Sequence, residues 1–353
     1  MSRRRGRPLL KGRVPSADTV GYAYARAKPD GIRKVLVEMQ KLALRKKVLR
    51  HRGRHTPWTV MIDAHEVSPS FCRTCPECLE RKVGKEGEER VQYYHRHVMA
   101  QLVDAEPPMC LDAELIRPGE GETVAARRLI ARVMRNFPFV RVFTMDAIYL
   151  EAPVLRLIAK AGRGAIVVLK QEARDLYQDA RALMRMEPAR KESVDGEEIA
   201  YWDIRGFKGW SGLEGIDIRV VRTILRRKVR HRIAKKWVET EEEQDWTWAT
   251  VGIGPEVGAL TIHRLGHARW DGENCGFNEQ DRYFGLDHIY HHDPKAILNF
   301  ILTLFLATFL TEVFFTRNLK NPRWLGMTLL GLCRLLLENP PMPGEPSIWA
   351  SGP

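Results

Sequence analysis

The sequence predicts an α/β protein with a β-rich insertion and a basic helical N-terminal region. Three observations predict this fold class. Short apolar runs of strand length alternate with helical stretches between residues 57 and 187. Residues 188–251 then alternate apolar and polar side chains between frequent glycines, which is typical of an inserted sheet. Helical periodicity returns in residues 252–338, and the Pro-, Gly- and Ser-rich residues 339–353 are expected to form a flexible tail.

Residues 1–56 form the basic N-terminal region. The chain of 353 residues has a formal net charge of +13, and 17 of its 57 Lys and Arg residues lie before residue 56, against three acids. Apolar side chains recur at helical spacing from Asp30 onward. This one-sided charge favours a polyanionic partner such as nucleic acid, and the alternative is a merely solvated arm.

The region 57–187 is predicted to contain a hairpin first and then helices that alternate with strands, which is typical of an α/β core. The expected strands cover residues 59–62, 91–103, 109–115, 140–145 and 165–169. The expected helices cover residues 122–135, 152–161 and 172–184. A loop with three cysteines, residues 68–85, follows the first strand.

One apolar segment, residues 296–315, is long enough to span a membrane. It contains Glu312 and several other polar residues, so we expect a fully buried core helix instead. Further helices are expected over 257–282 and up to residue 337. The basic N-terminus lacks the apolar core of a secretory signal, and six cysteines are too few for a disulfide scaffold. We therefore expect a cytoplasmic protein with no membrane partner.

Two of the predicted strands end on an aspartate, Asp63 and Asp146. A lone aspartate at a strand end is usually a turn residue, but two can converge on one edge of a sheet. Together with a helical glutamate at that edge they would make a carboxylate cluster for a hard cation, Mg²⁺ or Mn²⁺. Two such ions about 4 Å apart suit phosphodiester chemistry, which agrees with the basic N-terminal region.

Eight motifs between residues 15 and 319 carry a resemblance to a known family. They are VMIDAHE at 60–66, CPECL at 75–79, YYH at 93–95, RPGEGET at 117–123, DAIY at 146–149, RWDGEN at 269–274, GFNE at 276–279 and GLDHIY at 285–290. On these motifs the chain resembles the DDE transposases of bacterial insertion sequences, in the group typified by insertion sequence four. The resemblance covers most of the chain.

This resemblance implies a catalytic triad of Asp63, Asp146 and Glu273, whose positions are 83 and 127 apart in the sequence. It implies an RNase H-like (retroviral-integrase-like) core in which the β-rich insertion separates Asp146 from Glu273. The implied activity is nicking of transposon ends and transfer of the freed 3′-hydroxyl to target DNA, with two Mg²⁺ ions. The implied partners are the transposon end, the target DNA and a second copy of the chain in a synaptic dimer, in the nucleoid of a bacterial cytoplasm.

The chain departs from the family's signature around the glutamate, which is Tyr-x2-Arg-x3-Glu-x6-Lys. Arg269 and Glu273 fit this spacing, and Arg269 is implied to hold phosphate. The Tyr position is Gly266 and the Lys position is Gln280, so Arg282 is one candidate to substitute for the missing contacts. These departures support the alternative of a catalytically weakened, transposase-derived DNA-binding protein.

The insertion contains a dense basic stretch between residues 219 and 236, followed by acids at 239–243. Such density predicts phosphate contact, and a solvated charged hairpin is the alternative. The residues expected to bind DNA there are Arg222, Arg226, Arg227, Lys228, Arg230 and Arg232. Three tryptophans in or beside the insertion could stack on a displaced base, although core packing is expected for at least two of them: Trp210, Trp246 and Trp248.

The cysteine-containing loop has the spacing Cys72-x2-Cys75-x2-Cys78 and lies before His95. Three thiols and one imidazole can hold a structural Zn²⁺ ion, and the alternative is a set of reduced thiols. His291 and His292 are expected at the surface. Glu122 is expected to be a first-turn helix acid that the helix dipole favours.

Overall fold

The structure is a computed structural model of the chain. It describes residues 15–53, 56–170, 174–194, 197–233, 236–272, 277–287, 291–319 and 326–338. The predictions for Glu273, for all the basic residues before Pro15 and for the tail 339–353 fall outside these described residues.

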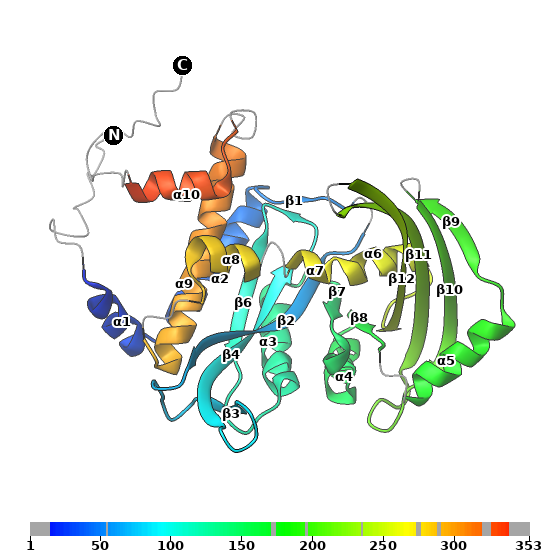
Figure 1. The fold of residues 1–353 in the computed structure, drawn as a ribbon, viewed down its shortest axis with the longest axis horizontal. Helices are drawn as coiled ribbons and strands as arrows, with labels where there is room; N and C mark the ends of the chain where they lie inside the picture. The colour runs from blue at the N-terminus through cyan, green and yellow to red at the C-terminus, as the bar shows by residue number, and fades with distance from the viewer. Residues whose placement is uncertain are drawn as a thin grey trace.

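One large mixed sheet runs across the molecule in the order β3-β4-β2-β7-β8-β12-β11-β10-β9, with β6 also paired to β4 (Figure 1). Its strands are β2 (Thr59–Ser70), β3 (Leu79–Val83), β4 (Arg90–Leu102), β6 (Met109–Leu115), β7 (Val142–Met145), β8 (Gly164–Val168), β9 (Arg190–Val194), β10 (Glu197–Lys208), β11 (Asp217–Ile233) and β12 (Lys236–Val251). Strands β2, β7 and β8 are parallel, and the other pairings are antiparallel. The predicted mixed α/β architecture is therefore confirmed.

The helices lie on both faces of this sheet. They are α1 (Ala17–Arg26), α2 (Pro29–Arg45), α3 (Glu122–Asn136), α4 (Ala152–Lys160), α5 (Asp175–Met186), α6 (Ala259–His267), α7 (Arg269–Gly272), α8 (Asn278–Phe284), α9 (Pro294–Val313) and α10 (Leu329–Glu338), with short helical turns η1 (Ala147–Tyr149) and η3 (Phe314–Asn318). A two-stranded ladder pairs β1 (Arg50–His51) with β5 (Ala105–Glu106). The helix expected over 257–282 is divided among α6, α7 and α8.

Alternate residues of β2 pack into two separate cores. Val60 and Ile62 pack in the core that includes α3 and α4, whereas Met61 packs in the core that includes α6 and α9. Strands β7 and β8 are buried along their whole length, as parallel strands covered on both faces must be. Their continuous apolar runs are the pattern from which the sequence predicted them.

Three expectations for the strands require correction. β2 does not end at Asp63 but continues to Ser70, because residues 63–67 pair with β4 after the parallel pairing with β7 has stopped at Ile62. β3 lies within the stretch expected to be a cysteine-containing loop. The strands of the insertion also do not form a sheet of their own, because Trp248 to Val251 pair with β8 and extend the central sheet.

The long apolar helix α9 packs against α1, α2 and β6. Together with η3 it spans Pro294–Asn318, and these 25 residues are long and apolar enough to cross a membrane, although half of the most apolar window is buried. Glu312 is only 7% exposed. The prediction of a fully buried core helix therefore holds only for the face that contacts the rest of the fold, because Leu310 on the other face is 53% exposed.

Helix α1 was not predicted from the sequence. Ser16 caps its N-terminus, because the Ser16 side chain accepts a hydrogen bond from the amide of Thr19. Asn299 of α9 donates hydrogen bonds to the carbonyl oxygens of Tyr24 and Ala27 at 2.7 and 2.9 Å. These bonds hold the end of α1 on the rest of the fold.

Candidate functional site

Asp63 and Asp146 follow the last parallel pair of β2 and β7. The register aligns Ile62 with Met145, so the next residue of each strand is an aspartate. Asp63 continues along β2, and Asp146 precedes the short helix η1. Their side chains are 16% and 35% exposed, respectively. The two aspartates therefore lie at equivalent positions on neighbouring strands, one residue beyond the last parallel pair.

Arg269 of α7 contacts Asp63 directly. Its Nη1 donates to Asp63 Oδ2 at 2.6 Å, and the arginine side chain is only 8% exposed. The other oxygen of Asp63, Oδ1, accepts a hydrogen bond from the Ala64 amide at 2.9 Å. The sequence predicted that Arg269 would hold phosphate, and the structure instead shows it buried against a carboxylate.

The chain that follows residues 273–276 also contacts β2. The ring of Phe277 stacks on His65 at a centroid distance of 4.6 Å. His65 Nε2 lies 3.6 Å from Asp281 Oδ1 and 3.4 Å from Asp287 Oδ1. Burial raises the pKa of Asp281 to about 6. Segments on both sides of residues 273–276 are therefore attached to β2 within two residues of Asp63.

Asp146 has a cationic partner that sequence analysis missed. Lys170, two residues beyond β8, lies with its Nζ 3.2 Å from Asp146 Oδ1. The same Nζ lies 6.0 Å from the centroid of the Trp246 ring. The sequence contains a signal from which Lys170 could have been predicted. Lys170 follows the apolar run of the third parallel strand, just as Asp63 and Asp146 follow those of the first two, and such positions can converge on one edge of a sheet.

A buried hydrogen-bond network holds η1 beside Asp146. Tyr149 Oη donates to Glu122 Oε1 at 2.6 Å, and Arg96 Nη2 donates to Glu122 Oε2 at 2.6 Å. Burial and the negative charges of Glu122 and Asp63 raise the pKa of Tyr149 well above its usual range, so its hydroxyl remains a donor. Glu122 is thus a buried acceptor with two partners and not only a first-turn helix acid.

The tryptophans of the insertion have different environments. Trp248 is 1% exposed and belongs to the core, as expected for at least two of the three. Trp210 packs at the edge of the other core cluster. Trp246 is partly buried, stacks on Trp248 at 6.1 Å and meets Trp270 edge-on at 4.6 Å. Of the three, Trp246 is the one that lies beside Lys170 and Asp146.

The two positions that depart from the family signature are interior. A Cβ atom built on Gly266 would lie 2.7 Å from Trp248 Cε2 and 2.9 Å from Trp248 Cδ1, and closer still to Nε1. Gln280 is 1% exposed and donates to Cys110 Sγ at 3.1 Å. A tyrosine and a lysine at these positions would therefore point into the packed interior of this chain.

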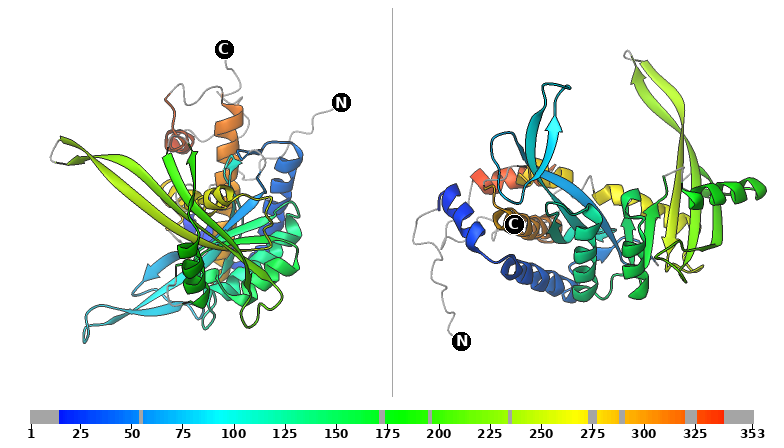
Figure 2. Two further views of the ribbon diagram at one scale, coloured as in Figure 1. Left: turned by 90° about the vertical axis from the view of Figure 1, so that its right-hand side faces the viewer. Right: turned by 90° about the horizontal axis from the view of Figure 1, so that it is seen from below.

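The basic stretch of the insertion forms one strand of the long hairpin β11–β12, which projects from the body of the protein (Figure 2). Acids on β12 face most of its basic residues. The ion pairs are Arg222–Asp245, Arg226–Glu243, Arg227–Glu242, Lys228–Glu239 and Arg230–Glu239, at 2.5–3.7 Å. Arg232 is exposed on the same strand and Arg282 is exposed on α8. The hairpin therefore has less net positive charge than its basic strand alone.

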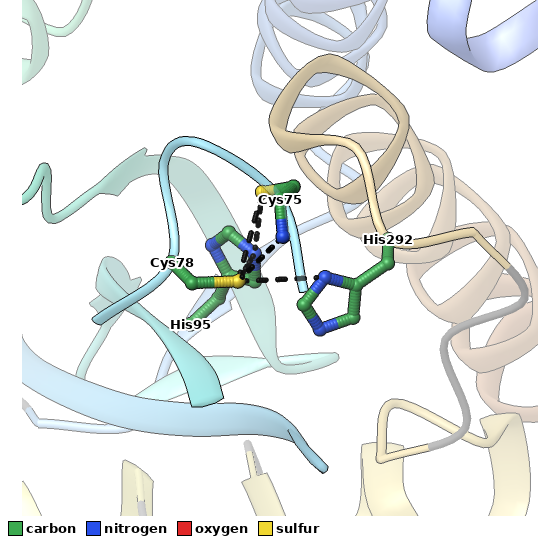
Figure 3. A group of neighbouring side chains, drawn as sticks. All are labelled: Cys75, Cys78, His95 and His292. Atoms are coloured by element: carbon green, nitrogen blue, oxygen red, sulfur yellow. Dashed lines mark hydrogen bonds between the residues drawn. The ribbon is translucent and has the colours of Figure 1, made fainter. Parts of the chain in front are cut away.

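A compact group of sulfur and nitrogen atoms is formed by four other side chains (Figure 3). Its members are Cys75, Cys78, His95 and His292, whose ligand atoms all lie within 4.8 Å of one another. Cys72, predicted as a ligand, is exposed and lies outside the group. His292, expected at the surface, is the fourth member instead, with its Nδ1 3.5 Å from Cys78 Sγ. Burial lowers the pKa of His95 to about 4 and raises that of Cys75 to about 11.

No protein-family model and no curated protein sequence matches the chain. Among solved structures, the fold is similar to a chain of the piggyBac transposase in a synaptic complex with hairpin DNA, with a TM-score of 0.39 and 11% sequence identity. The alignment covers 81% of this chain and 55% of that one. A similarity of this degree does not assign the chain to a family.

Proposed function

We propose that the protein is a metal-dependent DDE transposase with an RNase H-like core. Asp63, Asp146 and Glu273 are its catalytic carboxylates in this proposal. The observation that carries it is the attachment of the chain on both sides of residues 273–276 to β2, beside Asp63. Asp63 and Asp146 are themselves in register. Arg269 and Phe277, which flank the segment that contains Glu273 in the sequence, thus lie beside the residues of β2 around Asp63.

The donor chemistry of these residues fits Mg²⁺. Carboxylate oxygens are the ligands that hard cations prefer, and both aspartates are partly exposed. Each already accommodates a positive charge, Arg269 at Asp63 and Lys170 at Asp146. Asp63, Asp146 and Glu273 would hold the ions, which would supply activation of the attacking oxygen and stabilisation of the leaving oxygen.

The residues around the acids have roles of their own in this proposal. Arg269 fixes the carboxylate of Asp63 and the start of the segment that leads to Glu273. Lys170 orients Asp146 and is half exposed, so its ammonium group can also meet a phosphate. Trp246 presents an aromatic ring beside Lys170 on which a nucleobase can stack.

The proposal predicts Mg²⁺-dependent cleavage of a duplex that carries the ends of the element. Asp146→Ala is expected to reduce the nicking rate by more than about 100-fold, because even outer-shell partners of a metal site are worth about 10–100-fold. The control is Asp179→Ala, since Asp179 is an exposed residue of α5. The measurement is the rate of strand nicking on labelled duplex. Equal nicking rates for the wild type and Asp146→Ala would exclude the proposed transposase activity.

The second candidate is a catalytically weakened DNA-binding protein. It is favoured by the interior positions of Gly266 and Gln280, which cannot supply the contacts of the family's Tyr and Lys. The same substrate separates the two candidates. Tight binding of the duplex without any Mg²⁺-dependent nicking would support the second candidate, a DNA-binding protein with weakened catalysis.

We also propose that the exposed face of the β11–β12 hairpin contacts DNA phosphates. The triple variant Arg226→Gln, Lys228→Gln, Arg230→Gln is expected to reduce the slope of log K against log salt by about 2 to 3, at about 0.9 per lost phosphate contact. The control is Lys160→Gln at the exposed end of α4. An unchanged salt slope with reduced stability would show that these residues serve only the ion pairs within the hairpin.

A further inference from the structure

Four side chains from three distant parts of the chain direct their sulfur and nitrogen atoms at one point (Figure 3). Cys75 and Cys78 belong to the segment between β2 and β3, His95 belongs to β4, and His292 lies just before α9. The sulfur of Cys78 lies 3.7 Å from Cys75 Sγ, 3.5 Å from His95 Nε2 and 3.5 Å from His292 Nδ1. Cys75 Sγ lies 3.4 Å from His95 Nε2.

These four separations match four of the six edges of a zinc tetrahedron. With Zn–S bonds of about 2.3 Å and Zn–N bonds of about 2.0–2.1 Å, tetrahedral geometry requires about 3.8 Å between two sulfurs and about 3.5 Å between sulfur and nitrogen. The one sulfur–sulfur and three sulfur–nitrogen distances given above agree with these values within about 0.2 Å.

Hydrogen bonding alone explains the group less well. The thiol of Cys78 has a single proton, yet its sulfur contacts three ligand atoms at once. The imidazole N–H groups can also donate, but a protonated ring nitrogen cannot accept, so at least one contact among Cys75, Cys78 and His95 has no proton of its own. A central cation bonds all four atoms together without any such proton. His95 is 2% exposed and Cys78 is 7% exposed, so water offers them little compensation.

We propose that Cys75, Cys78, His95 and His292 form a structural zinc site. Four protein ligands complete a tetrahedron and leave no open position, which is typical of structural and not catalytic zinc. The site joins the β3–β4 hairpin to the start of α9, so the ion closes a loop of about 200 residues between His95 and His292. This proposal is independent of the proposed transposase activity.

The backbone around the cysteines is already shaped for such a site. The amide of Cys75 donates to Cys78 Sγ at 3.2 Å, and the amide of Cys78 donates to the carbonyl oxygen of Cys75 at 3.1 Å. A turn therefore directs both sulfurs to the same side. Asp293 fixes the other end, because its side chain caps α9 by accepting from the amides of Lys295 and Ala296.

The experiment is metal analysis of the full chain, purified without chelator. We expect about one zinc per chain in the wild type and near none in Cys78→Ser and His292→Ala. The matched control is Cys72→Ser, which removes an exposed thiol of the same segment and is expected to retain the metal. Equal loss of zinc from Cys72→Ser and Cys78→Ser would overturn this ligand set, as would full retention in His292→Ala.

A second measurement needs no variant. Removal of zinc from the wild type by a chelator is expected to lower the melting temperature, and Zn²⁺ but not Mg²⁺ is expected to restore it. Replacement by Co²⁺ is expected to give the absorption bands of tetrahedral thiolate coordination. Wild-type protein that contains no zinc, and that shows neither the bands nor a chelator-sensitive melting temperature, would overturn the proposal.

Discussion

Asp112→Ala is expected to lower the free energy of unfolding by about 3 kcal/mol, the lower end of the range for breaking a buried ion pair. Asp112 of β6 is 1% exposed. Its Oδ1 accepts from Arg33 Nε and its Oδ2 from Arg132 Nε, both at 2.8 Å. The substitution leaves two nearly buried guanidinium groups without this carboxylate. The cost stays at the lower end because Arg132 retains Glu114 and Arg33 retains Asp30.

Asp30→Ala is the matched control, because Asp30 pairs with the same arginine. Asp30 is 93% exposed, so its ion pair with Arg33 is screened by water and its loss is expected to cost less than about 1 kcal/mol. The measurement is urea-induced unfolding of the two variants and the wild type. Equal destabilisation by both substitutions would contradict the view that burial of Asp112 sets the strength of the contact.

The same contact changes the interpretation of the basic N-terminal region. Arg33 of α2 donates to Asp112 inside the fold, and Gln40 of the same helix donates to the carbonyl oxygens of Cys110 and Leu111. Helix α2 is therefore docked on β6, and the described part of this region is not a solvated arm. Its other basic residues, such as Lys34 on the exposed face, remain available to a polyanion. Net charge along a sequence does not distinguish basic residues that form ion pairs inside the fold from basic residues that can bind a polyanion.

The sequence predicted the parts of the site that depend on local patterns. Apolar runs at 59–62 and 140–145 ending on Asp63 and Asp146 predicted neighbouring strands, and the register bears out their alignment. The contact of Arg269 with Asp63 joins residues 206 positions apart, and no local pattern contains it. His292 was missed as a neighbour of Cys78 for the same reason, because 214 residues separate them.

The ion pairs within the charged hairpin β11–β12 could also have been predicted from the sequence. Basic residues of β11 and acids of β12 lie at mirrored sequence positions on either side of residues 234–235, which is the pattern of a cross-strand ladder. Arg226 faces Glu243 and Arg230 faces Glu239 in the observed register. The density of basic residues by itself indicated DNA, whereas their mirrored arrangement with the acids also predicts ion pairs within the hairpin.

Gly266→Ala is expected to lower the free energy of unfolding by about 2–3 kcal/mol, the upper part of the range for overpacking a core. The added methyl group would lie within 3 Å of three atoms of the Trp248 indole. Trp248 is 1% exposed and is packed against Trp246, His263 and His267, so the ring cannot move aside freely. Gly31→Ala is the matched control, because Gly31 lies in the exposed part of α2 with no atom within 4 Å. There the alanine is expected to stabilise the helix by about 0.5–1 kcal/mol.

A double-mutant cycle tests why Gly266→Ala is expected to destabilise the protein whereas Gly31→Ala is expected to stabilise it. Trp248→Leu replaces the indole ring with a smaller side chain and is expected to cost about 3 kcal/mol alone by leaving a cavity. In the Gly266→Ala background the same substitution is expected to cost less, since the methyl group fills part of that cavity. Additive costs would mean that Trp248 is not what excludes a side chain at Gly266. Coupling would mean that the packing of Trp248 is what requires a glycine at position 266.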